Sequence, residues 1–74
     1  MSKFKPYKGN IIAQETVKTY VTTVFQVVEI DGDGKHYGYE VQVYENDIFE
    51  CGRCYWYKKT ALNNMKNWAD ALRD

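Results

Sequence analysis

The 74-residue chain has few of the residues that build catalytic or metal sites, with two cysteines, one histidine and a single proline. It has no net formal charge either, because ten basic residues balance ten acidic ones. A neutral chain lacks the high pI that is the main compositional sign of nucleic-acid binding. The first residues after Met1 are polar and basic, unlike a secretory signal or a membrane span. We therefore expect a cytoplasmic protein with no membrane association.

The composition, 45% hydrophobic and 16% aromatic, is that of a folded domain. A chain this short buries only about 60–65% of its unfolded surface. We expect one domain with one small core, in which large aromatic side chains supply much of the buried area.

The clearest pattern is an alternation in the middle of the chain. Apolar or aromatic residues occupy every second position at Tyr37, Tyr39, Val41 and Val43. A period of two is typical of a strand with one buried and one exposed face. It predicts a strand over residues 35–45, a reversal at Asn46-Asp47, and a strand from residue 48 to about residue 57, interrupted at Gly52.

An earlier segment, residues 17–30, is rich in β-branched residues, which pack well on a pleated surface and disfavour a helix. It predicts one long strand. Its apolar residues fall on both parities, which a bulge near residues 26–28 or burial of both faces would explain. The sequence Asp31-Gly32-Asp33-Gly34 then predicts a turn.

The period changes after Thr60, which we predict to be the N-cap of a C-terminal helix of about 13 residues. Its apolar positions are Leu62, Met65, Trp68 and Leu72. A helix of this length is marginal alone and needs packing against the sheet. The expected partners are Tyr37, Tyr39, Val41 and Val43.

The expected fold is therefore α+β: a three-stranded antiparallel β-meander with one C-terminal α-helix packed on one face (βββα). Residues 1–16 are expected to be an irregular N-terminal lead-in, and residues 17–74 a single domain. The other face of the sheet would be uncovered and would show His36, Glu40, Gln42 and Tyr44. Because short chains often complete a core by association, a homodimer is an open alternative.

The acidic residues are concentrated between Glu29 and Glu50, where seven acids accompany one base, Lys35. Basic residues are concentrated near both ends. Such a dipole steers encounters with a basic surface. The predicted partner-binding residues are Asp31, Asp33, Glu40, Tyr44, Glu45 and Asp47. The alternative is that hairpin turns are simply solvated with acids.

Cys51 and Cys54 have the spacing of a redox dithiol or of half a zinc site. A redox pair needs a helix N-terminus, but these cysteines lie in a predicted strand, where residues three apart point to opposite faces. Zinc needs four ligands, and His36 is the only other soft candidate, so a complete site would join two chains. We interpret both as structural thiols and predict no metal and no cofactor, with a disulfide- or metal-linked dimer as the alternative.

No other residues form a catalytic constellation. Asp31-Gly-Asp-Gly matches only the first four positions of a calcium loop, and His36 has no partner at motif spacing. We predict that the protein is not an enzyme.

An aromatic and basic run supports a nucleic-acid-binding domain as the alternative, since sheet aromatics can stack bases while cations contact phosphates. The residues for this role are Arg53, Tyr55, Tyr57, Lys58 and Lys59. Alternation, however, should turn Trp56 and one neighbouring tyrosine into the core.

The favoured interpretation is a small non-enzymatic module that binds another protein through its acidic turns. In size and element order the chain resembles the small accessory proteins of phages and mobile elements, some of which inhibit host defence nucleases. This resemblance implies an inhibitor that blocks a basic surface of a host macromolecule in the bacterial cytoplasm.

Overall fold

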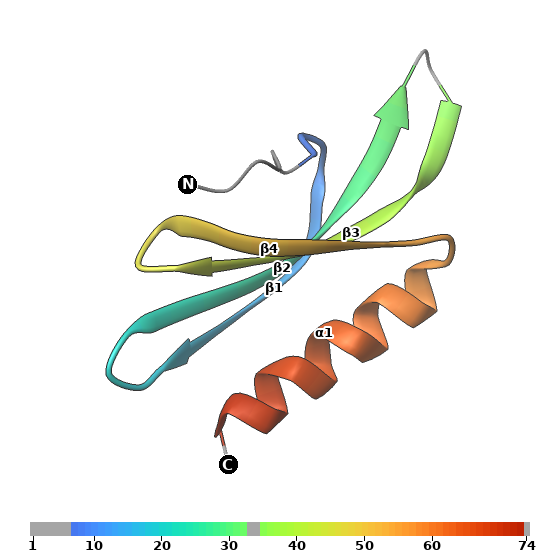
Figure 1. Ribbon diagram of the computed structural model, residues 1–74. Coiled ribbons are helices and arrows are strands. Elements are labelled where there is room, and N and C mark those ends of the chain that lie inside the picture. Colours follow the sequence, from blue (N-terminus) through green and yellow to red (C-terminus); the bar gives the residue numbers. More distant parts are fainter. Residues whose placement is uncertain (1–6, 33–34, 74) are drawn as a thin grey trace.

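The computed structural model of the protein describes residues 7–32 and 35–73 (Figure 1). Its elements are the strands β1 (Ile11–Lys18), β2 (Thr22–Gly32), β3 (Lys35–Glu45) and β4 (Ile48–Tyr55), followed by the helix α1 (Lys58–Arg73). The strands form one antiparallel sheet in the order β1-β2-β3-β4. Helix α1 lies across one face of this sheet (Figure 1). The expected α+β class, with an antiparallel sheet and one C-terminal helix, is confirmed.

The sheet has four strands, so the prediction of three is wrong. The predicted long strand over residues 17–30 is divided by a turn at residues 19–21, where the Thr19 amide donates to the Val21 carbonyl at 2.9 Å. Residues 11–16, expected in the lead-in, belong to β1 and pair with β2. The turn lacks the glycine, proline or asparagine that usually marks a reversal. Its β-branched residues are typical of a strand, so the sequence pattern predicted that the strand continues. Tyr20 at its tip is fully exposed.

The reversal between β3 and β4 is confirmed at Asn46-Asp47. Both residues have positive φ, 50° and 69°, as a two-residue hairpin turn of type I′ requires. The Asn46 side chain also accepts a hydrogen bond from the Thr22 amide at 3.0 Å, which ties this turn to the start of β2. Strand β4 ends at Tyr55 rather than Tyr57.

Helix α1 begins at Lys58, two residues before the predicted N-cap, so Thr60 lies within its first turn. The Thr60 carbonyl accepts a hydrogen bond from the Asn64 side chain at 2.8 Å. The buried line of the helix is Ala61, Met65 and Ala69. Leu62 and Trp68 flank this line against the core as expected, but Leu72 is 39% exposed.

The core lies between α1 and the sheet. It contains Val17, Phe25, Val27 and Val41 from the sheet, with Tyr39, Val43 and Tyr55 partly buried around them. Three of the four predicted partners of the helix, Tyr39, Val41 and Val43, are in this cluster. Tyr37 is outside the cluster and half exposed. Ile30 of β2 pairs with Gly38 and Asp31 pairs with His36, so the register shift skips Tyr37 and breaks the alternation at this position.

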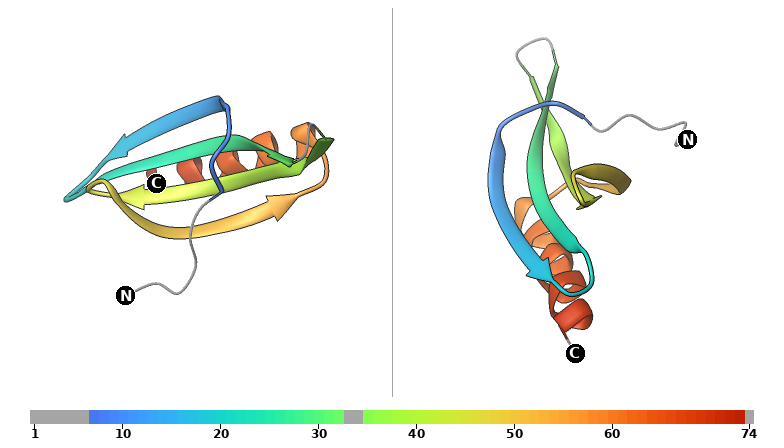
Figure 2. Two further views of the ribbon diagram at one scale, coloured as in Figure 1. Left: turned by 90° about the horizontal axis from the view of Figure 1, so that it is seen from above. Right: turned by 90° about the vertical axis from the view of Figure 1, so that its left-hand side faces the viewer.

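The mixed parity of β2 comes from burial on both faces. Val27 is buried under α1 and its neighbour Val28, pointing the other way, is only 2% exposed. The pairing of β2 with β3 runs without a shift from Thr23 to Ile30. The irregularity opposite Val27 and Val28 lies in β1, where Ile12 is the extra residue between Ile11 and Ala13, so the predicted bulge near residues 26–28 is not in β2 itself. Residues 7–10 cover the second face, as Figure 2 shows from above. We call residues 7–10 the strap.

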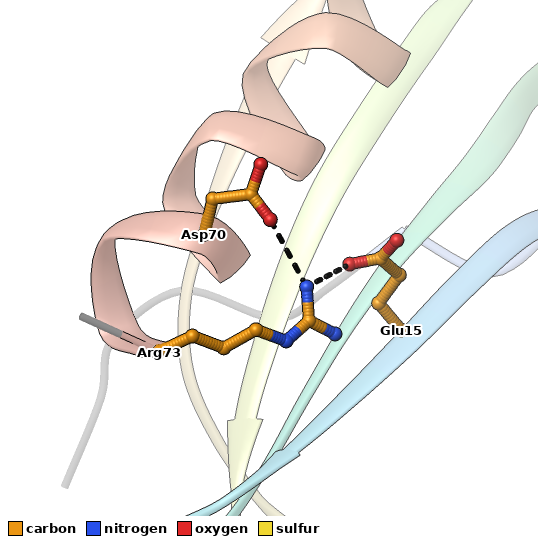
Figure 3. Close-up of polar contacts among 3 residues, drawn as sticks. All are labelled: Glu15, Asp70 and Arg73. Carbon is orange, nitrogen blue, oxygen red and sulfur yellow. Dashed lines mark hydrogen bonds and ion pairs between the residues drawn. The ribbon is translucent and has the colours of Figure 1, made fainter.

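The last turn of α1 is tied to β1 by Arg73. One guanidinium nitrogen, Nη1, contacts the carboxylates of Glu15 at 3.1 Å and Asp70 at 3.0 Å (Figure 3). All three side chains are partly exposed, so these ion pairs contribute on the order of 0–1 kcal/mol each. They fix the end of the helix more than they stabilise the fold.

Candidate functional site

A row of three glutamines crosses the sheet on the face opposite α1. Gln14, Gln26 and Gln42 are neighbours on β1, β2 and β3. The Gln14 amide donates to Gln26 Oε1 at 3.2 Å, and the Gln26 amide donates to Gln42 Oε1 at 2.7 Å. Gln42 is only 1% exposed. The row therefore runs from an exposed glutamine on β1 to a buried one on β3.

The row ends at a buried carboxylate, Glu40, which is 5% exposed. Its Oε1 accepts hydrogen bonds from the backbone amide of Tyr7 at 3.0 Å and from the side-chain amide of Gln42 at 2.6 Å. Its Oε2 lies 4.0 Å from Cys54 Sγ. Gln42 also donates to the Tyr7 carbonyl at 2.7 Å. Within the described residues, no buried side-chain nitrogen or oxygen lacks a partner. The expectation that Glu40 and Gln42 are exposed is therefore wrong, because the strap closes over them.

Two glycines make this arrangement fit. A Cβ at Gly52 of β4 would stand 2.9 Å from Cδ and Oε2 of Glu40, so the carboxylate occupies the space a side chain would take. A Cβ at Gly9 of the strap would collide with the carbonyl oxygen of Glu29. The strap is held there because the Glu29 amide donates to the Asn10 carbonyl at 2.9 Å.

The carboxylate influences two titratable neighbours. Burial, and second the charge of Glu40, raise the pKa of the Cys54 thiol above its ordinary value. The same causes, in the same order, raise the pKa of the Tyr44 hydroxyl, which donates to Gln42 Oε1 at 3.0 Å. A raised thiol pKa keeps Cys54 protonated near neutral pH and makes it a weaker nucleophile.

Beside this network lies a shallow hollow of about 270 Å³, which we call the aromatic hollow. Its lining residues are Tyr7, Ile30, Tyr37, Cys54, Tyr55 and Trp56. They come from the strap, from β2, from the start of β3 and from the end of β4, with Trp56 just beyond it. Trp56 is 79% exposed, and Tyr7 and Tyr37 are each about half exposed. Sequence reasoning missed this site, because its aromatic residues lie in three separate segments of the chain.

The predicted partner-binding residues do not form one surface. Asp31 of β2 pairs with His36 near the start of β3, whereas Glu45 ends β3 and Asp47 lies in the turn that follows, so nearly the full length of β3 separates them. These three acids are exposed, whereas Tyr44 is partly buried and packs its ring edge to face against Phe49, with centroids 5.6 Å apart. Asp33 and the side chain of His36 lie outside what the structure describes.

Cys51 and Cys54 are free thiols that lie on opposite faces of β4. Cys51 pairs with Val43 on the side of α1, and Cys54 pairs with Glu40 on the side of the strap. The bulge that would bring them together is not at Gly52, since the register shift of this pair of strands lies between Val43 and Tyr44. In residues 7–32 and 35–73, no three His, Cys, Asp or Glu side chains gather as a metal ion would need.

The residues of the nucleic-acid alternative are divided. Tyr55 is part of the core cluster, and Arg53 pairs with Val41 on the helix side of β4. Trp56 and Tyr57 both point outward, at 79% and 73% exposure, and precede the exposed Lys58 and Lys59. The prediction that Trp56 and one neighbouring tyrosine turn inward is wrong for Trp56, because β4 has ended before it.

Comparison of the chain with protein-family profiles, curated proteins and solved structures gave no match. Over the described part of the chain, no helix has both the length and the apolar character to cross a membrane. Function must therefore be inferred from the geometry of the residues themselves.

Proposed function

We propose that the chain is a small non-enzymatic protein-binding module that acts in the cytoplasm, with the aromatic hollow at the centre of its contact surface. The observation that carries this proposal is the convergence of Tyr7, Tyr37 and Trp56 around one hollow, each at least half exposed. Tryptophan and tyrosine are enriched among the residues that dominate the binding energy of protein interfaces. Leaving three such rings in water is unfavourable unless a partner covers them.

The surroundings of the hollow suit a docking surface. The backbone of Tyr7 makes two hydrogen bonds to side chains: its amide donates to Glu40 and its carbonyl accepts from Gln42. One wall of the hollow is therefore ordered before binding. A preformed surface loses less conformational entropy on association. The inhibitor role implied by the resemblance to small phage accessory proteins is consistent with such a module, since an inhibitor of this kind needs only to occupy a partner's surface.

The proposal is tested by quantitative capture from an extract of the native host, followed by affinity measurement with the purified partner. The test variants are Trp56→Ala and Tyr37→Ala, and the matched control is Tyr20→Ala, whose exposed ring lies in the turn between β1 and β2. We expect one protein to be retained by the wild type and the control, and its affinity to fall at least about tenfold in the test variants. Equal affinity for all variants would remove the hollow from the interface.

A second candidate function, single-stranded nucleic-acid binding, is favoured by one observation. Trp56 and Tyr57 are exposed in succession beside Lys58 and Lys59, and exposed rings next to cations can stack bases and contact phosphates.

This candidate is tested by fluorescence anisotropy with a labelled thymidine oligonucleotide at several salt concentrations. Lys58→Ala/Lys59→Ala should weaken binding and flatten its salt dependence, whereas Lys18→Ala/Lys35→Ala removes the same charge elsewhere and should not. Absence of binding at low salt would reject the candidate.

A further inference from the structure

The aromatic hollow combines ring surfaces with an uncharged lining. Among the residues that the structure describes, those lining it are four aromatic residues, an isoleucine and a cysteine. Its volume of about 270 Å³ is below the range of roughly 300–1,000 Å³ typical of pockets for drug-sized ligands. It therefore suits the end of one side chain rather than a whole small molecule.

A negative charge lies directly behind this lining. The Glu40 carboxylate contacts two of the lining residues, through the Tyr7 amide at 3.0 Å and Cys54 Sγ at 4.0 Å. Because Glu40 is only 5% exposed, water screens its charge less than it screens a surface acid. The raised pKa of the Cys54 thiol, due to burial and then to this charge, is consistent with a negative potential at the floor of the hollow.

In the described part of the chain, none of the basic side chains near the hollow lines it. Lys8, which follows Tyr7, lines a neighbouring hollow with Gln26 and Gln42, and Lys58 begins α1 two residues after Trp56. Arg53 precedes Cys54 but pairs with Val41 on the opposite face of the sheet. Lys35 pairs with Gly32 farther out along the hairpin, beyond Asp31 and its partner His36. A negative potential repels phosphate and attracts cations, and the faces of tryptophan and tyrosine rings attract cations as well.

We propose that the aromatic hollow binds a cationic side chain, the guanidinium of an arginine or the ammonium of a lysine, presented by a partner protein. The cation lies against the faces of Tyr7, Tyr37 and Trp56, above Cys54 and the Glu40 carboxylate. This proposal rests on the proposed protein-binding function and names the chemistry that the hollow recognises. It places recognition of a basic partner in the hollow rather than in the acidic turns.

The test is a nuclear magnetic resonance titration of the ¹⁵N-labelled chain with blocked single amino acids. The cationic probes are N-acetyl-arginine N-methylamide and N-acetyl-lysine N-methylamide, and their neutral counterparts carry citrulline and norleucine. The readout is the indole N–H signal of Trp56, with that of Trp68, which packs against the core, as internal reference. Trp56→Ala is the test variant and Tyr20→Ala its control.

We expect at least one cationic probe to shift the Trp56 signal at millimolar concentration and to bind about three- to tenfold more tightly than its neutral counterpart. The amide signals around Cys54 should move with Trp56, and Trp56→Ala should abolish those movements while Tyr20→Ala preserves them. Glu40→Gln, which keeps a hydrogen-bond acceptor, should reduce the preference for the cation, with the unchanged Trp68 signal reporting an intact fold.

Equal binding of the neutral probes would overturn the inference, as would the lack of any shift of Trp56 or a stronger shift with a thymidine oligonucleotide. Equal neutral binding would leave the proposed protein-binding function standing, with an apolar side chain as the ligand of the hollow. If the captured partner binds Trp56→Ala as tightly as the wild type, the proposed protein-binding function of the hollow is itself rejected. The two failures are therefore distinguishable.

Discussion

Glu40 shows how much of a residue's role depends on its neighbours. Alternation along β3 places Glu40 on the face of the sheet away from α1, as the sequence predicted. Burying a carboxylate is costly unless it is hydrogen-bonded, and here the Tyr7 and Gln42 amides provide the bonds. A residue expected at an exposed contact surface is instead a fixed internal charge.

The space for this charge depends on Gly52, which gives the first prediction. Gly52→Ala places a Cβ 2.9 Å from Cδ and Oε2 of Glu40, so the carboxylate must move and strain its hydrogen bonds. We expect the free energy of unfolding to fall by about 1–3 kcal/mol, measured by urea denaturation. The control, Cys51→Ala, changes the exposed neighbouring residue and should shift it by less than about 0.5 kcal/mol. Similar values for both variants would mean that Glu40 moves without cost.

At the scale of elements, α1 packs by its smallest residues. Ala61 and Ala69 are fully buried with Met65 between them, one turn from each. Small side chains let the helix approach the sheet closely, and the flexible methionine fills the space between. The sequence pattern predicted the helix but emphasised its largest apolar residues, because hydrophobicity alone does not show how close two surfaces lie.

The second prediction compares two positions of α1. Met65→Ala removes a side chain that is 5% exposed at the centre of the core, and Leu72→Ala one that is 39% exposed at the helix end. We expect the free energy of unfolding to fall by about 2–5 kcal/mol for Met65→Ala and by less than about 1 kcal/mol for Leu72→Ala. Chemical denaturation of both variants measures the difference. A larger loss at Leu72 would contradict the observed packing of the helix.

At the scale of the molecule, charge is divided between the two layers. Helix α1 carries Lys58, Lys59, Lys66 and Arg73 against Asp70. The strands carry Glu29, Asp31, Glu40, Glu45 and Glu50, and Asp47 lies in the turn between β3 and β4. The dipole expected from the sequence thus corresponds to a basic helix and a more acidic sheet. Such a field orients the molecule as it approaches a charged partner.

The third prediction concerns the pH dependence of the whole fold. Folding raises the pKa of Cys54 above 9.0 and that of Tyr44 above 10.0, by burial and then by the charge of Glu40. The folded state therefore holds these protons more tightly, and the associated stability is complete below pH 9 and lost as pH rises through the folded values. We expect urea midpoints to fall progressively above about pH 9.

The control for this pH dependence is Cys54→Ser/Tyr44→Phe, which removes both groups. Its urea midpoint should change less steeply between pH 8 and pH 11 than that of the wild type. An identical slope in the two proteins would show that other groups cause the alkaline loss of stability.

The sequence by itself determined the order of β3, the Asn46-Asp47 turn, β4 and the helix, because period and turn chemistry are local properties. The tertiary structure alone decided that residues 11–16 belong to a strand and that the strap closes over Glu40 and Gln42. The Tyr7–Glu40 hydrogen bond joins residues 33 positions apart, and no local pattern encodes such a contact. The aromatic hollow has the same origin, since its rings come from segments that only folding brings together.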